Sequence, residues 1–307
     1  MASDAILRGY GDTNIREDVV LNAIEILTPK ENWFVTNLAK SRSIALTHTF
    51  QVDTLRAAAT QAVESGADYT ALAISTPTRL NNVIEHVAVP FKVNKAEQAV
   101  EHYSGTNELE RQTMKAMSDW GNAAEFDLVR STLVSGVSGT VPKMSGIIQA
   151  ISKSTNTTAH TSGTAFSASI LNGLMVGNWD NSNGEVATDL FMGSFLRNVL
   201  DGFTQKSNVV VASLGLTELV NSVDAYRTSA GVLRIHTHRY VQQSSDATGR
   251  ILGVRPEKLK IAYLNMPYID TTLARSGPYD FRAVAGDLTL EVNNQDSNFF
   301  ASGFDKD

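Results

Sequence analysis

The side chains best suited to chemistry are His236 and His238, which stand two residues apart in the segment VLRIHTHRYV. Residues two apart on a strand point to the same side, so two imidazoles spaced in this way can ligate one metal ion. No third ligand follows at a matching spacing, and packed or surface histidines are commoner than metal ligands. A metal site in an α+β enzyme therefore stays an alternative, and we assign no catalytic, cofactor-binding or metal-binding residue.

Other catalytic patterns are missing from the sequence. It has no Gly-Lys dipeptide, which a P-loop requires, and no His followed by Glu, which a zinc protease helix requires. Glu125 and Asp127 lie two apart on a predicted helix, so their carboxylates point to different sides and do not form an acid/base pair. The absence of cysteine excludes thiolate catalysis and disulfides. We therefore expect a protein that is not an enzyme and has no cofactor.

The composition is that of a folded protein with little affinity for phosphates. Its 307 residues are 42% hydrophobic and 19% charged, which suffices for a substantial core. The net charge of -6 and the absence of any run of lysine or arginine predict no tight nonspecific binding of nucleic acid. The sequence has no stretch of about 18 apolar residues, so we expect no membrane partner.

The longest predicted element is a helix over residues 107–134. Asn107 is a suitable N-cap and Glu110 can complete a capping box, while the glycines and serines of 135–139 end the helical pattern. At about 1.5 Å per residue this helix is about 40 Å long. Its apolar residues recur at three- and four-residue steps and form one face that we expect to cover a sheet: Met117, Trp120, Ala124 and Leu128.

A shorter helix is predicted to begin after Thr28. Thr28 is its cap, Pro29 lies in its first turn and Glu31 closes a capping box. Its apolar side chains are explained either by packing on their own domain or by contact with a neighbouring subunit. These side chains are Trp33, Phe34, Val35 and Leu38.

Residues 49–93 change to an extended pattern with two arms, one around Phe50 and one running from Val83 to Val93. A lone two-stranded ribbon is at best marginally stable in water. We therefore expect a projection of this length to lie on another surface.

The rest of the chain mixes helices and strands. Residues 135–146 form a connection rich in glycine, serine and threonine, and residues 152–164 read as a loop, while residues 165–176 and 195–203 predict two helices. Residues 219–241 predict a hairpin that turns at Ala230-Gly231. Residues 284–292 alternate as an amphipathic strand with one buried face. Gly173 and Gly177 are spaced for a close backbone approach.

The order of these segments resembles the major capsid proteins of tailed bacteriophages with the Hong Kong type capsid fold, in the branch that lacks a fused N-terminal scaffold. The likeness spans most of the chain and is weakest from about 140 to 215. The matching stretches are LTPKENWFVTNLAKS (27–41), HTFQVDTLRAA (48–58), TRLNNVIEHVAVPFKV (78–93), the helix around 125–133, AYRTSAGVLRIHTHRYV (225–241), LKIAYL (259–264) and LARSGPYDFRAVAGDLTLEVNN (273–294).

This resemblance implies an α+β capsid fold and a container function. The implied parts are an N-terminal arm (1–41), an extended β-hairpin loop (42–100), the spine helix of a peripheral domain (101–139), an axial domain (140–265), and the closing strand of the peripheral domain with the C-terminus (266–307). Hexamers and pentamers would form an icosahedral or prolate shell around double-stranded DNA, assembled in the host cytoplasm. Further implied partners are a portal protein and scaffolding or decoration proteins.

Subunit contacts are expected on the elements least able to bury themselves. We predict the contact residues Trp33, Phe34, Phe50, Leu55, Arg79, Asn81, Asn82, Val87 and Phe91. Some relatives crosslink subunits through a lysine on the extended loop, but no lysine lies between Thr49 and Phe91, so we expect no covalent crosslink from its tip. An encapsulin-like compartment, which shares the fold and differs in its contents, is a further alternative.

Overall fold

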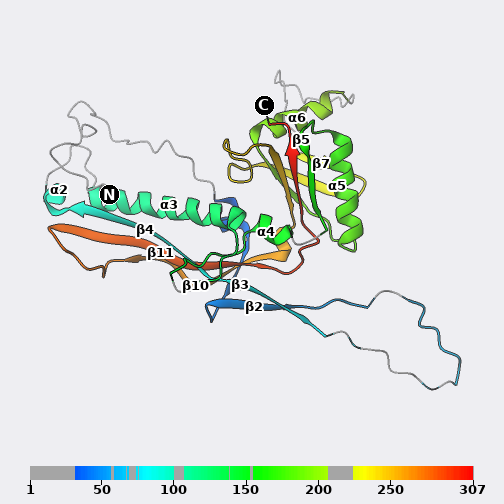
Figure 1. The fold of residues 1–307 in the computed structure, drawn as a ribbon, viewed down its shortest axis with the longest axis horizontal. Coiled ribbons are helices and arrows are strands. Elements are labelled where there is room, and N and C mark those ends of the chain that lie inside the picture. Colours follow the sequence, from blue (N-terminus) through cyan, green and yellow to red (C-terminus); the bar gives the residue numbers. More distant parts are fainter. Residues whose placement is uncertain are drawn as a thin grey trace, which may run out of the picture.

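The computed structural model describes residues 32–56, 59–66, 68, 74, 76–99, 107–137, 139–152, 155–206 and 224–306. These residues form an elongated half built on a four-stranded sheet, a compact half built on a six-stranded sheet, and a two-stranded ribbon that projects from the body (Figure 1). The predicted capping residues Thr28, Pro29 and Glu31 lie outside the described residues. None of the described helices is long and apolar enough to cross a membrane.

The four-stranded sheet of the elongated half has the order β1-β10-β11-β4. Its first strand is parallel to β10 and the other pairs are antiparallel. The strands are β1 (Ala39–Arg42), β10 (Leu259–Asp270), β11 (Tyr279–Val292) and β4 (Glu85–Asn94). Two short helices flank it, α1 (Trp33–Asn37) before β1 and α2 (Lys95–Ala99) after β4.

The predicted long helix is α3 (Glu108–Arg130), and it lies along one face of this sheet (Figure 1). Asn107 is its N-cap, because the side-chain Oδ1 accepts a hydrogen bond from Leu109 N at 3.0 Å. Trp120 fixes the helix to the sheet, since its Nε1 donates to Val87 O at 2.9 Å and its ring lies against Gly286. A Cβ at Gly286 would come within 2.8 Å of this ring, so the close approach requires glycine.

Two details of the predicted helix are wrong. Its 23 residues span about 35 Å, because Ser131 leaves the helical conformation well before the glycines and serines of 135–139. Met117 is 49% exposed, whereas Trp120, Ala124 and Leu128 are buried. The buried line continues toward the N-terminus through Ala116, one position from Met117, as steps of four residues require.

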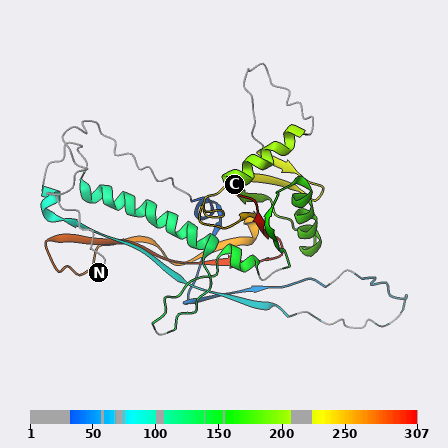
Figure 2. The same ribbon diagram turned by 45° about the horizontal axis from the view of Figure 1, so that its top comes forward.

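The ribbon pairs β2 (Thr47–Val52) with β3 (Thr78–Val83) and extends away from the rest of the molecule (Figures 1 and 2). The expectation that both arms of 49–93 project is wrong for the second arm. After the buried residue Ile84 the chain enters β4, which is a full member of the four-stranded sheet. The alternating pattern is the same in both strands, so the sequence did not separate them.

The predicted single buried face of β11 is also wrong, because Thr289 and Glu291 on the opposite face are buried as well. The root of the ribbon covers them. Thr289 Oγ1 donates to Val83 O at 2.8 Å, and Glu291 Oε2 lies 3.2 Å from His48 Nε2. The inner end of β11 therefore has α3 on one side and the ribbon root on the other.

The compact half is a mixed sheet of order β5-β12-β9-β6-β8-β7, with two helices packed on it. Its strands are β5 (Thr157–Thr164), β12 (Phe299–Phe304), β9 (Gly249–Val254), β6 (Asp189–Met192), β8 (Val232–Thr237) and β7 (Ala225–Arg227). The helices are α5 (Ala168–Asn181) and α6 (Ser194–Lys206). The short α4 (Ile147–Ile151) and a 3-10 turn (Pro256–Lys258) complete the elements.

Most predictions for this half agree with the structure. Both helices are present, and β7 pairs with β8 around a turn in which Thr228 N donates to Gly231 O at 2.8 Å. The predicted loop of 152–164 is wrong from residue 157 onward, since these residues form β5, an edge strand that pairs in parallel with β12. A partner far along the chain supplies this pairing, so local composition does not indicate it.

Two further expectations are corrected. Gly173 and Gly177 are not sites of close backbone approach, because a Cβ at either position would meet nothing within 4 Å. The predicted boundary near residue 265 does not follow the sheets, since β10 belongs wholly to the elongated half and β12 to the compact half.

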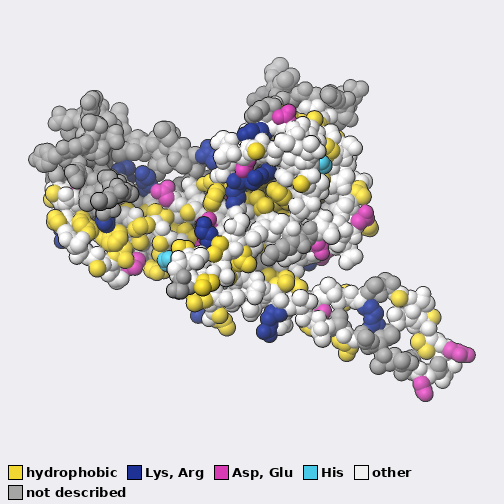
Figure 3. Space-filling view, in the orientation of Figure 1, with side chains coloured by type: hydrophobic (Ala, Val, Ile, Leu, Met, Phe, Trp, Pro, Cys, Tyr) yellow, Lys and Arg dark blue, Asp and Glu magenta, His cyan; other side chains and the backbone are white. Residues whose placement is uncertain are grey.

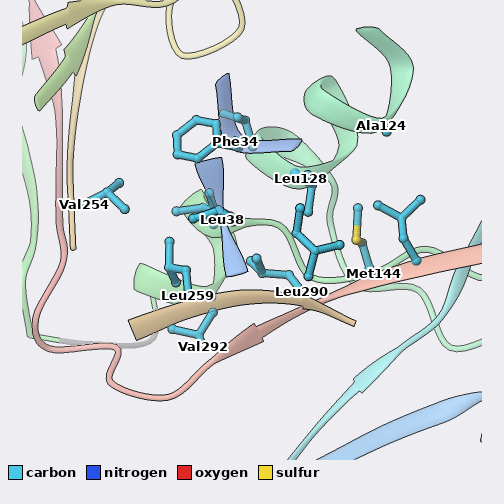
Figure 4. Close-up of a cluster of buried hydrophobic side chains, with 14 of the residues drawn as sticks. Phe34, Leu38, Ala124, Leu128, Met144, Val254, Leu259, Leu290 and Val292 are labelled. Carbon is cyan, nitrogen blue, oxygen red and sulfur yellow. The ribbon is translucent and has the colours of Figure 1, made fainter. Parts of the chain in front are cut away.

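One hydrophobic core joins the two halves. It unites side chains of α1, α3 and the four-stranded sheet with Phe191, Leu252, Val254 and Phe300 of the six-stranded sheet. Figure 4 shows Phe34 and Leu38 entering it from one side and Leu259, Leu290 and Val292 from the sheet below. A second core lies between α5, α6 and the six-stranded sheet.

Candidate assembly surface

The root of the ribbon is fastened to the body by Asn82. Its Nδ2 donates to Ser145 O at 3.1 Å and to Leu290 O at 2.8 Å, while its Oδ1 accepts from Ser145 N at 2.8 Å. The side chain is buried and all its polar atoms are used. Asn82 was predicted as a contact with a neighbouring subunit, and the structure corrects this, because the residue serves its own fold.

Glu85, next to the ribbon root, binds the same loop. Its Oε2 accepts from Met144 N at 3.1 Å and from Ser131 Oγ at 3.2 Å. Burial raises the pKa of Glu85, against the opposing effect of these hydrogen bonds. Burial, and then the charge of Glu85, raise the pKa of Asp127 to about 7. Two carboxyl groups next to the ribbon root, one on β4 and one on α3, therefore have ionised forms that are disfavoured in the folded state.

Beyond the root, the ribbon leaves large apolar side chains in solvent. Leu55 is 99% exposed and Ile74 is 90% exposed, although both are side chains that water disfavours. Phe50 is partly buried and stacks on His48 with ring centroids 6.0 Å apart. The predicted contact residues Phe50, Leu55, Arg79 and Asn81 thus all lie on this projecting segment.

The other predicted contact residues lie in the body. Phe34 is fully buried in the joint core and Val87 is buried beneath α3, which corrects their assignment as contact side chains. Both face their own fold because α3 covers them. Trp33 and Phe91 are partly buried at the border of the same core and keep some surface for a neighbour.

In the part of the chain that the structure describes, only the inner end of the sheet face opposite α3 is covered by another element. Residues of β4 that alternate with the α3-facing Val87 lie on this opposite face, and Ala88 and Pro90 among them are exposed. Ala285 pairs with Ala88 on one side and with Tyr268 on the other, so all three share this face. The ribbon root covers the inner end of the face, whereas this outer end carries small apolar side chains and the half-exposed Tyr268. Figure 3 shows hydrophobic side chains gathered over the elongated half.

The two histidines considered as metal ligands bind separate carboxylates. His236 Nε2 lies 2.9 Å from Asp189 Oδ1, and His238 Nε2 lies 3.0 Å from Glu125 Oε1. Among the described residues there is no group of three His, Cys, Asp or Glu side chains able to hold a metal ion. No pattern in the sequence indicates the contact between His238 and Glu125, because the two residues are far apart in the chain.

An elongated sheet under a long helix, a compact second half and a projecting ribbon together define the Hong Kong type of capsid fold. Solved structures agree with this class. The capsid of a native GTA particle matches with a TM-score of 0.64 at 11% identity over 93% of each chain. A protein of Microbacterium phage Oxtober96 matches with a TM-score of 0.62 at 15% identity over 93% of this chain and 95% of that one. The SrpI encapsulin of Synechococcus elongatus matches with a TM-score of 0.59 at 11% identity over 94% of both chains.

The chain belongs to the SU10 major capsid protein family, whose sequence model matches residues 8–304. It is a shell-forming structural subunit of the virion capsid. The α+β class and the capsid fold predicted from the sequence are thereby confirmed. No curated protein matches the sequence.

Proposed function

We propose that copies of this chain join as hexamers and pentamers into a closed icosahedral or prolate shell that encloses double-stranded DNA, and that the chain has no enzymatic activity. The observation that carries the proposal is the projecting ribbon. Its exposed Leu55 and Ile74 lie beyond the reach of the chain's own core and gain burial only on another molecule.

A second copy of the chain offers a matching surface. The outer end of the sheet face opposite α3 carries Ala88, Pro90 and Tyr268, and no element of the described residues covers it as the ribbon root covers the inner end. We expect the ribbon of one subunit to cover this face in the next subunit. Such head-to-tail contacts close into rings, and many weak contacts in one shell add up to avidity.

The charge of the chain fits a container for DNA. The net charge is -6, and a wall that bound phosphates tightly would hold the genome in place during packing and release. We further expect assembly in the host cytoplasm, with a portal protein and, depending on the pathway, scaffolding or decoration proteins as partners. The surfaces for these partners are not assigned.

A protein-filled compartment is the alternative to a DNA-filled head, because the SrpI encapsulin shares the fold of this chain. The two candidates share a shell and differ only in its contents. Particles purified from infected or induced cells should contain nuclease-resistant DNA if the chain forms a phage head. Particles that contain a protein cargo and no protected DNA would favour the compartment.

The shell itself is tested by expression of the chain, alone and together with its neighbouring genes. We expect negative-stain microscopy to show closed particles, and light scattering to show ring-sized intermediates. A chain that stays monomeric under all these conditions would contradict the proposal.

A further inference from the structure

The segment His238–Asp246, between β8 and β9, binds the C-terminal half of α3 at two places. At the first place His238 meets Glu125, and at the second place Gln243 and Asp246 meet Arg130. These contacts link the compact half, which carries the segment, to the long helix of the elongated half. The side chains of Glu125 and His238 are 0% and 1% exposed, whereas those of Arg130 and Asp246 are 14% and 6% exposed.

The first place is sealed from solvent. Glu125 and His238 are both buried, and the Glu125 carboxylate also accepts from Phe34 N at 2.7 Å and Val35 N at 2.8 Å. It thereby caps the start of α1, where Asn32 makes no side-chain cap. His238 Nδ1 accepts from Tyr240 N at 3.2 Å, so the proton on Nε2 points at Glu125. Loss of any one partner would leave buried polar groups without hydrogen bonds, which makes this place costly to open.

The second place is less deeply buried than the first. Arg130 Nε donates to Tyr240 O at 2.7 Å, its Nη1 donates to Gln243 Oε1 at 2.8 Å, and its Nη2 pairs with Asp246. The Arg130 side chain is 14% exposed and that of Asp246 is 6% exposed, so water reaches the arginine end of the contact and can replace its partners as the contact opens. Asp246 keeps a second cation, Arg250, at 3.4 Å when Arg130 leaves.

We propose that His238–Asp246 is a hinged latch, in which Glu125 and His238 form a fixed pivot and Arg130, Gln243 and Asp246 form a releasable end. The latch sets the angle between the compact half and α3. Between these two places the halves meet through apolar side chains such as Phe34 and Phe191, whose rings are 4.7 Å apart. Apolar contact is non-directional and tolerates a small rotation, whereas charge-assisted hydrogen bonds fix one geometry.

This inference rests on the proposed assembly of one chain into rings of five and six. Such rings require the compact half to take different angles toward its ring axis. A releasable end next to a fixed pivot allows this change without exposing the joint core. The latch would therefore decide which ring a subunit enters and how strongly the shell curves.

A reconstruction of the wild-type shell tests the latch directly. We expect the contact between Glu125 and His238 in every subunit, and the contact between Arg130 and Asp246 in only one class of ring. If both contacts are the same in all subunits, the latch is wrong although the shell stands. If no shell forms, the proposed function fails first, so the two failures are distinguishable.

Variants test the same point from the other side. Arg130→Met keeps the apolar stem and removes the guanidinium, and Asp246→Asn keeps the shape and removes the charge. We expect both to lose the single diameter class of wild-type particles in cryo-electron microscopy, with the unassembled chain still folded, although breaking a largely buried pair lowers its melting temperature. Arg255→Met is the matched control, because Arg255 pairs with the exposed Glu257 inside the compact half. Particles of wild-type diameter from both latch variants would overturn the proposal. If Arg130→Met does not fold, the particle diameter of Asp246→Asn alone decides whether the proposal holds.

Discussion

The two ends of the ribbon have opposite surroundings although they belong to one pair of strands. At the root, Asn82 and Glu85 are buried and bind main-chain groups of the loop at Met144 and Ser145. Past the far end of the paired strands, Leu55 and Ile74 are almost fully exposed. The two ends therefore differ in what can bury them. The chain's own fold buries the root, whereas under the proposed assembly another subunit would bury the remainder of the ribbon.

The largest effect is expected from breaking the root. Asn82→Ala removes the partners of Ser145 N, Ser145 O and Leu290 O, all of which lie in the interior. Leaving these groups without hydrogen bonds costs about 3 kcal/mol of the free energy of unfolding. Chemical denaturation of the unassembled chain measures this loss.

Asn81→Ala is the matched control, because Asn81 is the exposed neighbour on the same strand. Its effect should stay within about 0.5 kcal/mol. Equal stability of the two variants would show that the root is not the anchor described here.

Breaking the far end should abolish assembly and leave the fold unchanged. Leu55→Asp places a charge where the proposed contact buries an apolar side chain, and desolvation of an unpaired carboxylate opposes binding. The unassembled chain loses nothing, since Leu55 is 99% exposed. Sedimentation should find the variant as small species with a wild-type melting curve.

The conservative change Leu55→Met keeps apolar volume and should restore shells. If Leu55→Asp assembles like the wild type, the far end of the ribbon is not a contact. If it unfolds, the contrast between root and far end is wrong.

The comparison also explains why the sequence predicted some elements and missed others. Asn107 and the N-terminus of α3 were predicted correctly, since an N-cap acts within a few residues of itself. The hairpin of β7 and β8 was predicted for the same reason, from its turn. The boundary between β3 and β4 was missed, because alternation continues across Ile84 whether a strand projects or joins a sheet.

The contact residues divide along the same line. Phe34 and Leu55 are both large apolar residues on elements that resembled appendages, yet the first is fully buried in its own chain and the second is exposed. Apolar character predicts burial and does not tell which molecule provides it. The partner of Phe34 is α3, brought close by folding across many intervening residues, and no local pattern encodes that contact.

A change in pH should change the stability of the chain through the two carboxyl groups next to the ribbon root. Burial raises the pKa of Asp127 to about 7 from an ordinary value of 3.8, so the folded state binds more protons than the unfolded state between these values. Stability should therefore fall as pH rises from about 4 to about 7, and level off above. Glu85, with its raised pKa, acts in the same direction.

Asp127→Asn removes the cost of ionisation. At pH 8 it should stabilise the chain by up to about 2 kcal/mol, and near pH 4 it should have no effect. Asp119→Asn, on the exposed side of the same helix, is the control and should not change the pH profile in this way. If the unfolding midpoints of Asp127→Asn depend on pH in the same way as those of the wild type, Asp127 is not the source of the pH dependence.

The smallest effects are expected midway along the ribbon, at Phe50 and Arg79. Phe50 lies opposite Leu80 and is partly buried, and Arg79 lies opposite Gln51 and is exposed. Both Phe50→Ala and Arg79→Ala should impair shell assembly and leave folding of the chain largely intact. Arg79 is expected to act mainly on rate, since a charge at the border of a contact changes association and its salt dependence more than the final affinity.

Light scattering at several salt concentrations separates the two variants. Phe50→Ala should lower the yield of shells at every salt concentration, because it removes apolar area from the contact. Arg79→Ala should assemble slowly at low salt and approach the wild-type rate at high salt, where the charge is screened. Arg42→Ala, exposed on β1 and outside the paired strands of the ribbon, should match the wild type throughout. Normal assembly of both ribbon variants would place the subunit contact only beyond the paired strands, in the segment that carries Leu55 and Ile74.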